Sequence, residues 1–562
     1  MRWKMINLKA KDYFSKANYW KKFLFQTTGI VILTYIFFAF IIFKNLNIDV
    51  YSLSLVILFC YFSFLYSFNK IYNFWLFRKC YRLMMEEVYQ IQKEVKLPSK
   101  LPKVVYVYTT HNDFWKARLL QSMQQTYKNI EYWISDGSSN QEKSKEIQDF
   151  CKKYNVKYYS LKRPSVNKAD NLNHFLKHAK VKFDYLLISD SDVAIDKNFV
   201  TTSLKYFYYK KFKRLGWVTS LINSYPHNNL YNYLSKNIEN RNGFYNLEIN
   251  FSLNRHSPLH SSCSLISKEL LKDFDMQFPD SCLEDFWLEF LSLKKYYCGF
   301  KNPISISMEA FDMNILSRMT RLSRVYDWLI KLSKEHYWKN LNESKKFINN
   351  DLFNIIWYEP LKWIFYPLLW STTIFIFINF NQLLFHHYEY VVVVSCILFC
   401  FLIHFTIEII KSFRIFKWHF FQYSIMAYLN NFALFLYRPI HFFNAFFRSK
   451  YSDFTSSRIS IKNKKITTLY KSRQFIILFM ISATLLTIFD ILFILLRWNT
   501  LNMFLMFIFI YVNFVLSLII LSIITFFFLY SLSWIRKKSN DPNEFIYCKN
   551  ERMIAKSNEQ KM

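Results

Sequence analysis

The stretch YLLISDSD, residues 185–192, joins an apolar run to two carboxylates that stand one residue apart. Two similar runs precede it: residues 104–108 lead into a polar cluster that begins at Thr109, and residues 130–135 lead into Asp136. Helical patterns separate the three runs, and strands that alternate with helices predict a parallel sheet. In such sheets ligands bind at the carboxyl ends of the strands, where these acids fall. The sequence therefore predicts an α/β domain with a binding site at one sheet edge.

The acids at the end of this stretch, Asp190 and Asp192, are its strongest indication of chemistry. Two carboxylates at a strand end can share a hard divalent cation and a diphosphate, and both Mg²⁺ and Mn²⁺ accept oxygen ligands. Such a cation would neutralise the charge that develops on a departing nucleoside diphosphate. The same short pattern also occurs in solvated turns that cap a helix, so by itself it leaves both interpretations open.

Four elements together are more specific: VVYVYTTHND (104–113), SMQQTYKNIEYWISDGSS (122–139), NKADNLN (167–173) and YLLISDSD. In order and spacing they resemble the nucleotide-binding half of family 2 glycosyltransferases, which have the GT-A (Rossmann-like) fold. The resemblance implies that Asp136 contacts a uracil, that Lys168 lies near the donor phosphates, and that Asp190 and Asp192 hold the metal and the donor. The loop after the first strand would wall the nucleoside. The implied donor-binding residues are Thr109, Asp113, Asp136, Lys168, Asp190 and Asp192.

The second half of this region carries the expected acceptor elements. Residues 265–270 look like the family's strand and turn behind the acceptor pocket, and Glu284 and Asp285 open a segment with helical apolar spacing. In membrane-integrated members such as cellulose, chitin and hyaluronan synthases the Asp of this pair is the base. The resemblance implies that Asp285 takes the proton from the acceptor hydroxyl. A plain acid at a helix start, favoured by the helix dipole, is the alternative.

Those synthases also carry a Q-x-x-R-W element before the next membrane region. Here the equivalent stretch is Arg321-Leu322-Ser323-Arg324-Val325, without the Gln and the Trp. Arg321 and Arg324 lie on one helical face with Arg318, which suits either a diphosphate or lipid headgroups. This departure leaves open whether the enzyme is processive and whether its product is a polysaccharide.

Long apolar stretches flank the mixed-composition region, each able to cross a hydrocarbon core of roughly 30 Å. Because Lys and Arg crowd the outer flanks of the first two, both chain ends and the catalytic domain are expected on the cytoplasmic side of a cell membrane. Residues 331–357 and 418–447 mix charges with aromatics and suit helices in the interface, with a re-entrant or spanning pair as the alternative for the second. The expected spans are 23–43, 50–68, 363–380, 390–405, 475–495 and 503–532. The expected domains are a transmembrane hairpin with connector (1–96), a cytoplasmic GT-A domain (97–330) and a C-terminal membrane region (331–562).

Composition limits the partners. The formal net charge of +33 accompanies 52% hydrophobic residues, and part of this charge is expected to meet anionic lipid headgroups. No nucleic-acid motif accompanies it, so no nucleic-acid partner is expected. The nine cysteines are odd in number and none form C-x-x-C, which argues against a disulfide framework or a zinc site.

Three hypotheses follow for function. The first is an inverting hexosyltransferase that moves sugar from a nucleotide diphosphate donor, with UDP expected, to a saccharide or lipid acceptor. One version of it builds and exports a polysaccharide, and the other makes a glycolipid without translocation. The second hypothesis is a catalytically inactive membrane scaffold. This is disfavoured because the expected donor-binding, metal-binding and base residues are all present: Asp136, Asp190, Asp192 and Asp285. A transporter is weaker still, because the spans hold almost no embedded charge.

Overall fold

The computed structural model describes mainly one α/β domain and one long helix. The described residues are 85–310 with gaps at 162, 211, 213, 226–228, 232–233, 236–256, 258, 261 and 282–283; 315–319; 321; 330; isolated positions between 406 and 488; and 503–535 apart from 533. The first five expected spans lie almost wholly outside these residues.

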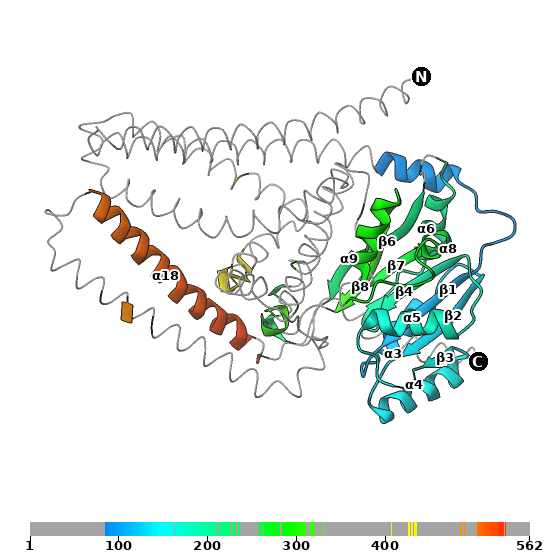
Figure 1. The fold of residues 1–562 in the computed structure, drawn as a ribbon, viewed down its shortest axis with the longest axis horizontal. Coiled ribbons are helices and arrows are strands. Elements are labelled where there is room, and N and C mark those ends of the chain that lie inside the picture. The colour runs from blue at the N-terminus through cyan, green and yellow to red at the C-terminus, as the bar shows by residue number, and fades with distance from the viewer. Residues whose placement is uncertain are drawn as a thin grey trace, which may run out of the picture.

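The described part of the domain is built on an eight-stranded sheet in the order β3-β2-β1-β4-β7-β6-β8-β5 (Figure 1). Strand β7 runs antiparallel to β4 and β6, β5 runs antiparallel to β8, and the other pairs are parallel. The strands are β1 (Val104–Thr110), β2 (Ile130–Asp136), β3 (Lys157–Ser160), β4 (Tyr185–Asp190), β5 (Val193–Ala194), β6 (Leu215–Tyr225), β7 (Cys263–Ser267) and β8 (Cys298–Ala310). The α/β fold predicted from the sequence is confirmed, and the three predicted strands are β1, β2 and β4.

Helices cover both faces of this sheet. On one face lie α3 (Lys116–Ser122), α4 (Gln141–Tyr154) and α6 (Phe199–Phe207). On the other lie α5 (Lys168–His178), α8 (Lys268–Lys272) and α9 (Glu284–Lys294). The three helical patterns between the predicted strands correspond to α3, α4 and α5.

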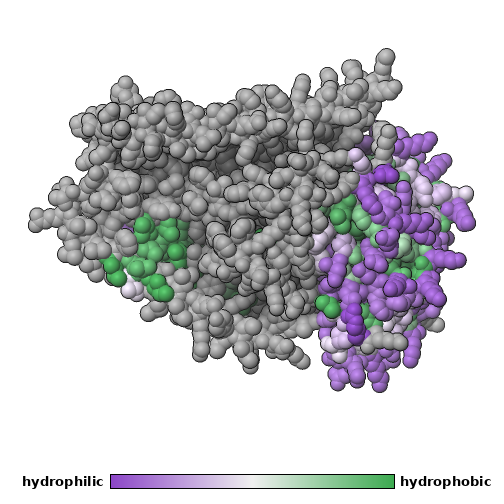
Figure 2. Space-filling model, viewed as in Figure 1, coloured by the Kyte–Doolittle hydropathy of each residue, from purple (hydrophilic) through white to green (hydrophobic). Residues whose placement is uncertain are grey.

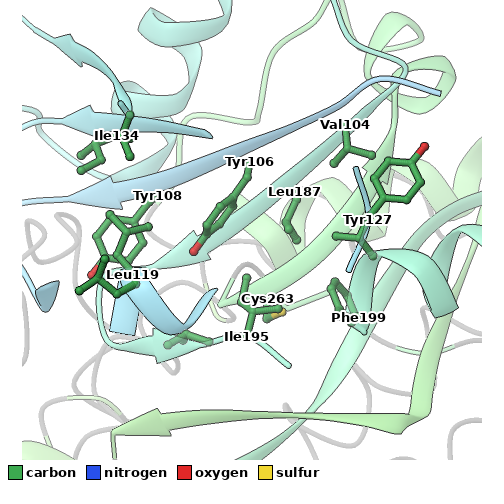
Figure 3. Close-up of a cluster of buried hydrophobic side chains, with 14 of the residues drawn as sticks. Val104, Tyr106, Tyr108, Leu119, Tyr127, Ile134, Leu187, Ile195, Phe199 and Cys263 are labelled. Atoms are coloured by element: carbon green, nitrogen blue, oxygen red, sulfur yellow. The ribbon is translucent and has the colours of Figure 1, made fainter. Parts of the chain in front are cut away.

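Strand β1 lies at the centre of the core because all seven of its residues are buried. Its side chains alternate between the faces: Tyr106 and Tyr108 pack with Leu119 of α3, whereas Val105 and Val107 pack on the side of α5. Figure 3 shows the first of these clusters, with the side chains of both tyrosines on the same side of the sheet. Burying each such side chain contributes roughly 1.5–3 kcal/mol, which holds the strand end rigid beneath the candidate site.

The ends of α4 follow from two asparagines. The Asn140 side chain accepts hydrogen bonds from the backbone N–H groups of Glu142 at 2.9 Å and Lys143 at 3.3 Å, which caps the first turn. Asn155 ends the helix in the left-handed conformation, at φ 52°, which Asn tolerates better than most residues. These two asparagines therefore define the start and the end of α4.

We predict a large stability effect at Gly299, in β8. A Cβ there would lie closer than 3.0 Å to the indole of Trp217 and to the backbone oxygen of Ser257, a separation that Cβ atoms in proteins do not show. Gly299→Ala should therefore lower the stability by roughly 1–3 kcal/mol, since neither group can move freely. Thermal unfolding of the purified full chain measures this. Gly216→Ala is the matched control, because its Cβ would meet a Leu270 methyl at 3.1 Å and the Tyr297 side chain at 3.4 Å, and no backbone atom is among these contacts. Equal melting temperatures for the two variants would contradict the prediction.

Helix α18 (Met503–Leu532) is the one described helix long and apolar enough to cross a membrane, judged by length and composition. Its window Val515–Leu532 has a mean hydropathy of 2.5. Phe526 and Leu529 pack in a cluster with Tyr231, while Leu521, Ile524 and Phe528 are exposed. Figure 2 shows hydrophobic side chains gathered where α18 lies, whereas hydrophilic side chains cover most of the visible α/β domain.

Part of the expected interfacial segment 418–447 is described; Met426, Asn430, Ala433 and Leu434 are buried in protein, whereas Ile425 is exposed. Asn430 accepts a hydrogen bond from the Tyr231 hydroxyl at 2.7 Å and donates to the Ser235 hydroxyl at 3.3 Å. Met426 and Leu434 join the cluster beneath α18. The segment that follows β6 therefore contacts residues from two C-terminal parts of the chain.

Candidate active site

The acids predicted from strand ends meet at one edge of the sheet. Strand β1 lies between β2 and β4, and its last residues pair with Asp136 (through Thr110) and with Asp190 (through Thr109). The two acids therefore flank the end of β1 on neighbouring strands, with strands about 4.8 Å apart. This placement agrees with the sequence expectation that parallel strands bring their carboxyl ends together.

Asp136 is held by an unusually full set of hydrogen bonds. One carboxylate oxygen accepts from the Thr110 hydroxyl and the Ser138 N–H, both at 3.0 Å. The other accepts from the Ser144 hydroxyl at 2.7 Å and the Tyr158 hydroxyl at 2.9 Å. The side chain is 1% exposed, and four bonds fill the usual acceptor capacity of a carboxylate. Asp136 thus joins the end of β1 to the loop after β2, to α4 and to β3, and its implied contact with a nucleobase stays a prediction.

Asp113 holds the central residue of the D-S-D element. Its carboxylate accepts hydrogen bonds from the His111 N–H at 2.9 Å and from the Ser191 hydroxyl at 2.5 Å. The Tyr108 hydroxyl donates to the backbone oxygen of the same serine. Asp113 therefore positions Asp190 and Asp192 through the residue between them. Sequence reasoning placed Asp113 in the nucleoside wall and missed this contact.

The loop after β1 is joined to the loop after β2 by Asn112, which sequence reasoning did not single out. Its side-chain oxygen accepts from the N–H groups of Ser139 at 2.9 Å and Asn140 at 2.8 Å. Asn112 has a φ of 59°, a left-handed conformation in which Asn is enriched. The Asn-Asp pair at 112–113 thus links both neighbouring loops to the edge of the site.

Lys168 forms an ion pair with Asp190, one of the predicted donor-binding acids. It is the first residue of α5, whose cap is Asn167 through the Asp170 N–H at 2.8 Å. The Lys168 ammonium donates a hydrogen bond to the Asp190 carboxylate. Burial alone would lower the pKa of Lys168, but Asp190, Glu284 and Asp285 outweigh it, and the pKa is raised. Lys168 therefore stays protonated among three carboxyl groups.

Glu284 is the most perturbed acid of the site. Its side chain is 3% exposed, and burial, followed by the neighbouring charge of Asp285, raises its pKa to about 8. Lys168 opposes this shift only in part. Asp285, the next residue of α9, is half-buried and accepts a hydrogen bond from the Phe286 N–H at 2.8 Å. Near neutral pH Glu284 is thus held protonated beside the predicted base.

The raised pKa of Glu284 predicts a stability that depends on pH. The folded chain keeps this proton up to about pH 8, whereas an ordinary glutamate releases it near 4.5. Because the folded state binds more protons between these values, its stability falls as the pH rises from about 4.5 to 8. Glu284→Gln should remove this loss of stability. The melting temperature of the variant relative to that of the wild type should therefore increase as the pH rises across that window. Thermal unfolding between pH 5 and pH 8.5 measures it. Glu142→Gln, at an exposed acid in the first turn of α4, is the control. Parallel curves of melting temperature against pH for Glu284→Gln and the wild type would contradict the prediction.

The remaining predicted site residues are placed less centrally. The Thr109 hydroxyl donates to the Ser189 backbone oxygen at 3.0 Å, so it is engaged within the sheet. Arg321 is exposed and acts electrostatically on His260, which lies in the loop before β7. Arg324 lies outside the described residues.

The chemistry of the donor set fits a cation that also binds a diphosphate. Asp190 is partly exposed at the sheet edge, and Asp192, 4% exposed, follows two residues later. Across the described part of the chain no group of three or more His, Cys, Asp or Glu side chains could hold a metal ion. Two carboxylates leave most positions of an octahedral Mg²⁺ for phosphate oxygens and water, which is how this ion usually binds. The site therefore suits a cation that arrives with a nucleotide.

Part of this domain matches the profile of a known family. Residues 106–275 match the profile of Glycosyl transferase family 2. No match is found among curated proteins. The matched region spans β1 to the turn after α8 and contains Asp113, Asp136, Lys168, Asp190 and Asp192.

Several solved structures are similar at low scores. A mannosyltransferase, PcManGT from Pyrobaculum calidifontis in complex with GDP-Man and Mn²⁺, has 13% identity and a TM-score of 0.38, covering 59% of this chain and 97% of its own. S. aureus TarS has 15% identity and a TM-score of 0.27, covering 45% and 48%. GalNAc-T7 with UDP, GalNAc and Mn²⁺ has 14% identity and a TM-score of 0.29, covering 38% and 45%. At these scores the likeness carries no weight for function.

The profile match, together with the acids at the sheet edge, defines the class of this protein. The chain carries a family 2 glycosyl transferase domain on an α/β sheet, and it is an enzyme of the glycosyltransferase type.

Proposed function

We propose that this enzyme transfers a sugar, with inversion, from a nucleotide diphosphate donor to an acceptor hydroxyl at the membrane face. UDP-sugar is the expected donor and Mg²⁺ or Mn²⁺ the expected metal. The acceptor is a saccharide or a lipid. Asp190 and Asp192 would hold the metal with the donor, and the metal, when bound, would offset negative charge on the departing diphosphate.

One arrangement supports this proposal most: Lys168 connects the donor acids with the acids of α9. Its ammonium contacts Asp190, and its charge is also stabilised by Asp285 of α9. A donor diphosphate at Asp190 would therefore lie within the field of Lys168, and an acceptor at Asp285 would lie close by. A single displacement needs these two neighbouring positions, because the attacking oxygen and the leaving group are in line at one carbon.

The proposed proton path is short. Asp285 accepts the proton of the acceptor hydroxyl while the acceptor oxygen bonds to the anomeric carbon. The bond from that carbon to the diphosphate oxygen breaks in the same step, and the electron pair leaves with the nucleoside diphosphate. Because Glu284 is already protonated, the neighbouring Asp285 is the carboxylate that receives the proton.

The membrane location belongs to the same proposal. Helix α18 presents an exposed apolar stripe that includes Leu521, Ile524 and Phe528, which suits contact with lipid. We propose a multi-pass protein of the cell membrane, with the catalytic domain and both termini on the cytoplasmic side. Polysaccharide synthesis with export is the main version, and glycolipid synthesis without translocation is the second, favoured by the missing Gln and Trp near Arg321.

Donor turnover by the purified protein in lipid tests the proposal. Radiolabelled UDP-glucose, UDP-galactose and UDP-N-acetylglucosamine are supplied with Mg²⁺, with Mn²⁺ or with a chelator. We expect metal-dependent release of UDP from one of them, and the size of the labelled product separates a polymer from a glycolipid. Bound nucleotide without turnover of any donor would contradict the transferase and favour a membrane scaffold.

A further inference from the structure

A row of buried polar side chains crosses the half of the sheet beyond the donor acids. Ser264 of β7 pairs with Thr219 of β6, which pairs with Lys301 of β8. The preceding pair in β6 and β8, Val218 and Phe300, packs in the cluster on one face of the sheet. Because side chains alternate along strands, Thr219 and Lys301 face the opposite side, the one that α9 covers.

Lys301 is a buried cation. Its side chain is 3% exposed, and among the described residues no carboxylate forms an ion pair with its ammonium. Beside it the hydroxyl of Thr219 is buried and has no hydrogen-bond partner within the described chain. Burial lowers the pKa of Lys301 to about 8. A buried ammonium beside an unsatisfied hydroxyl is costly unless a ligand completes the set.

The row lies next to the candidate active site through the loop before β7. The Ser262 backbone oxygen in this loop accepts a hydrogen bond from the Asp190 N–H at 3.3 Å. His260, two residues earlier, accepts through its own backbone oxygen from the Ser264 hydroxyl. Burial, then the positive charges of Lys301 and Arg321, lowers the pKa of His260 to about 3. His260 is therefore a neutral imidazole within the field of Lys301 and Arg321.

The distance from the donor acids decides which ligand Lys301 can serve. Strand β8 lies three strands from β4, at about 14 Å for spacings of 4.7–4.9 Å. A diphosphate held directly by Asp190 does not reach that far, so Lys301 would serve another part of the bound substrates, and the acceptor is that part.

We propose that Lys301, with His260 and the Thr219 hydroxyl, forms a subsite for an anionic group on the acceptor. The ligand is a carboxylate or a phosphate, carried by a uronic acid or by a phosphorylated polyol or lipid. The subsite rests on the proposed function for its role, and its occupancy can be measured without turnover.

The first test is protection of Lys301 from chemical modification in the full chain in lipid. Acetic anhydride acetylates uncharged amines, and peptide mass spectrometry gives the rate at Lys301. Glucuronic acid and glycerol phosphate are the anionic probes, and glucose and glycerol are their neutral counterparts. We expect one anionic probe to slow acetylation severalfold and its neutral counterpart to have no effect. Exposed Lys180 is the internal control and should react at one rate throughout.

The second test uses Lys301→Met and Lys301→Arg with acceptors of the protecting class. Lys301→Met should raise the KM for that acceptor about 10- to 150-fold, as for the loss of a hydrogen bond to a charged group, and Lys301→Arg should recover part of it. Hydrolysis of the donor by the variants should match the wild type, and thermal unfolding confirms that both fold.

Each outcome has one meaning. Protection by glucuronic acid assigns a uronate acceptor, and protection by glycerol phosphate assigns a phosphorylated one. Equal protection by neutral and anionic probes, or no protection while donor hydrolysis is intact, overturns the anion subsite and leaves the transferase standing. Protection in a chain that hydrolyses no donor keeps the subsite and overturns the proposed transferase.

Discussion

Asp285→Asn should lower kcat for sugar transfer by about 10²–10⁴-fold, the range that general base catalysis contributes. An amide keeps the size of the side chain and its hydrogen bond with the Phe286 N–H, but it cannot accept the proton of the attacking hydroxyl. The donor acids are unchanged, so the Kd of the nucleotide should stay within twofold to threefold of the wild type, within ordinary context dependence. Initial rates with the best donor, beside nucleotide binding by calorimetry, measure both quantities.

Asp275→Asn is the matched control for this substitution. It removes the same charge from an exposed residue of the same domain, at φ 54°, a conformation that Asn accepts readily. Its kcat should equal that of the wild type. A wild-type rate in Asp285→Asn would remove Asp285 as the base, and an equal loss in both variants would point to a general effect of charge.

The second large effect is expected at Asp192. Asp192→Asn should lower kcat/KM for the donor by roughly 10²–10³-fold, the scale for loss of one electrostatic stabiliser of the transition state. The remaining carboxylate of Asp190 would hold the cation alone, so higher concentrations of Mn²⁺ or Mg²⁺ should restore part of the rate. A metal titration of the initial rate for both proteins measures the shift in the half-saturating concentration.

Asp149→Asn, an exposed residue in α4, is the control for the metal titration. Its metal dependence should overlay that of the wild type. If Asp192→Asn lost activity without any change in its metal titration, the residue would act by holding the loop and not by holding the cation. Unaltered activity in Asp192→Asn would exclude it from the donor site.

The donor half of the site was largely predictable from the sequence because its residues are local to strand ends. Asp136 and Asp190 each end a buried run, and parallel pairing with β1 brings such ends to one edge. Lys168 opens a helix that the apolar spacing already predicts, although its link to the donor came only from the resemblance. The hydrogen bonds of Asp136 with Thr110 and Tyr158 and the Asp113–Ser191 contact were missed, because each joins residues that are far apart along the chain.

The acceptor half was less predictable. The antiparallel β7 between β4 and β6, and the short β5 beside β8, leave no periodicity that distinguishes their order. Sequence reasoning named Glu284 and Asp285 as a pair, but the resemblance alone assigned the role of base to the second. Lys301 carried no sequence signal, since a lysine in a strand is ordinarily solvated.

By itself, the sequence determined the α/β class, the positions of the strands β1, β2 and β4, and the acids at their ends, because hydrophobic periodicity and strand ends are local properties. Only the tertiary structure decided which of these groups share an environment. Burial at the start of α9 raises the pKa of Glu284, the neighbouring acids keep Lys168 charged, and Lys301 is buried in the row across β6–β8. A pKa and a desolvation cost depend on every charge and atom within a few ångströms, and residues far apart in the chain supply most of them.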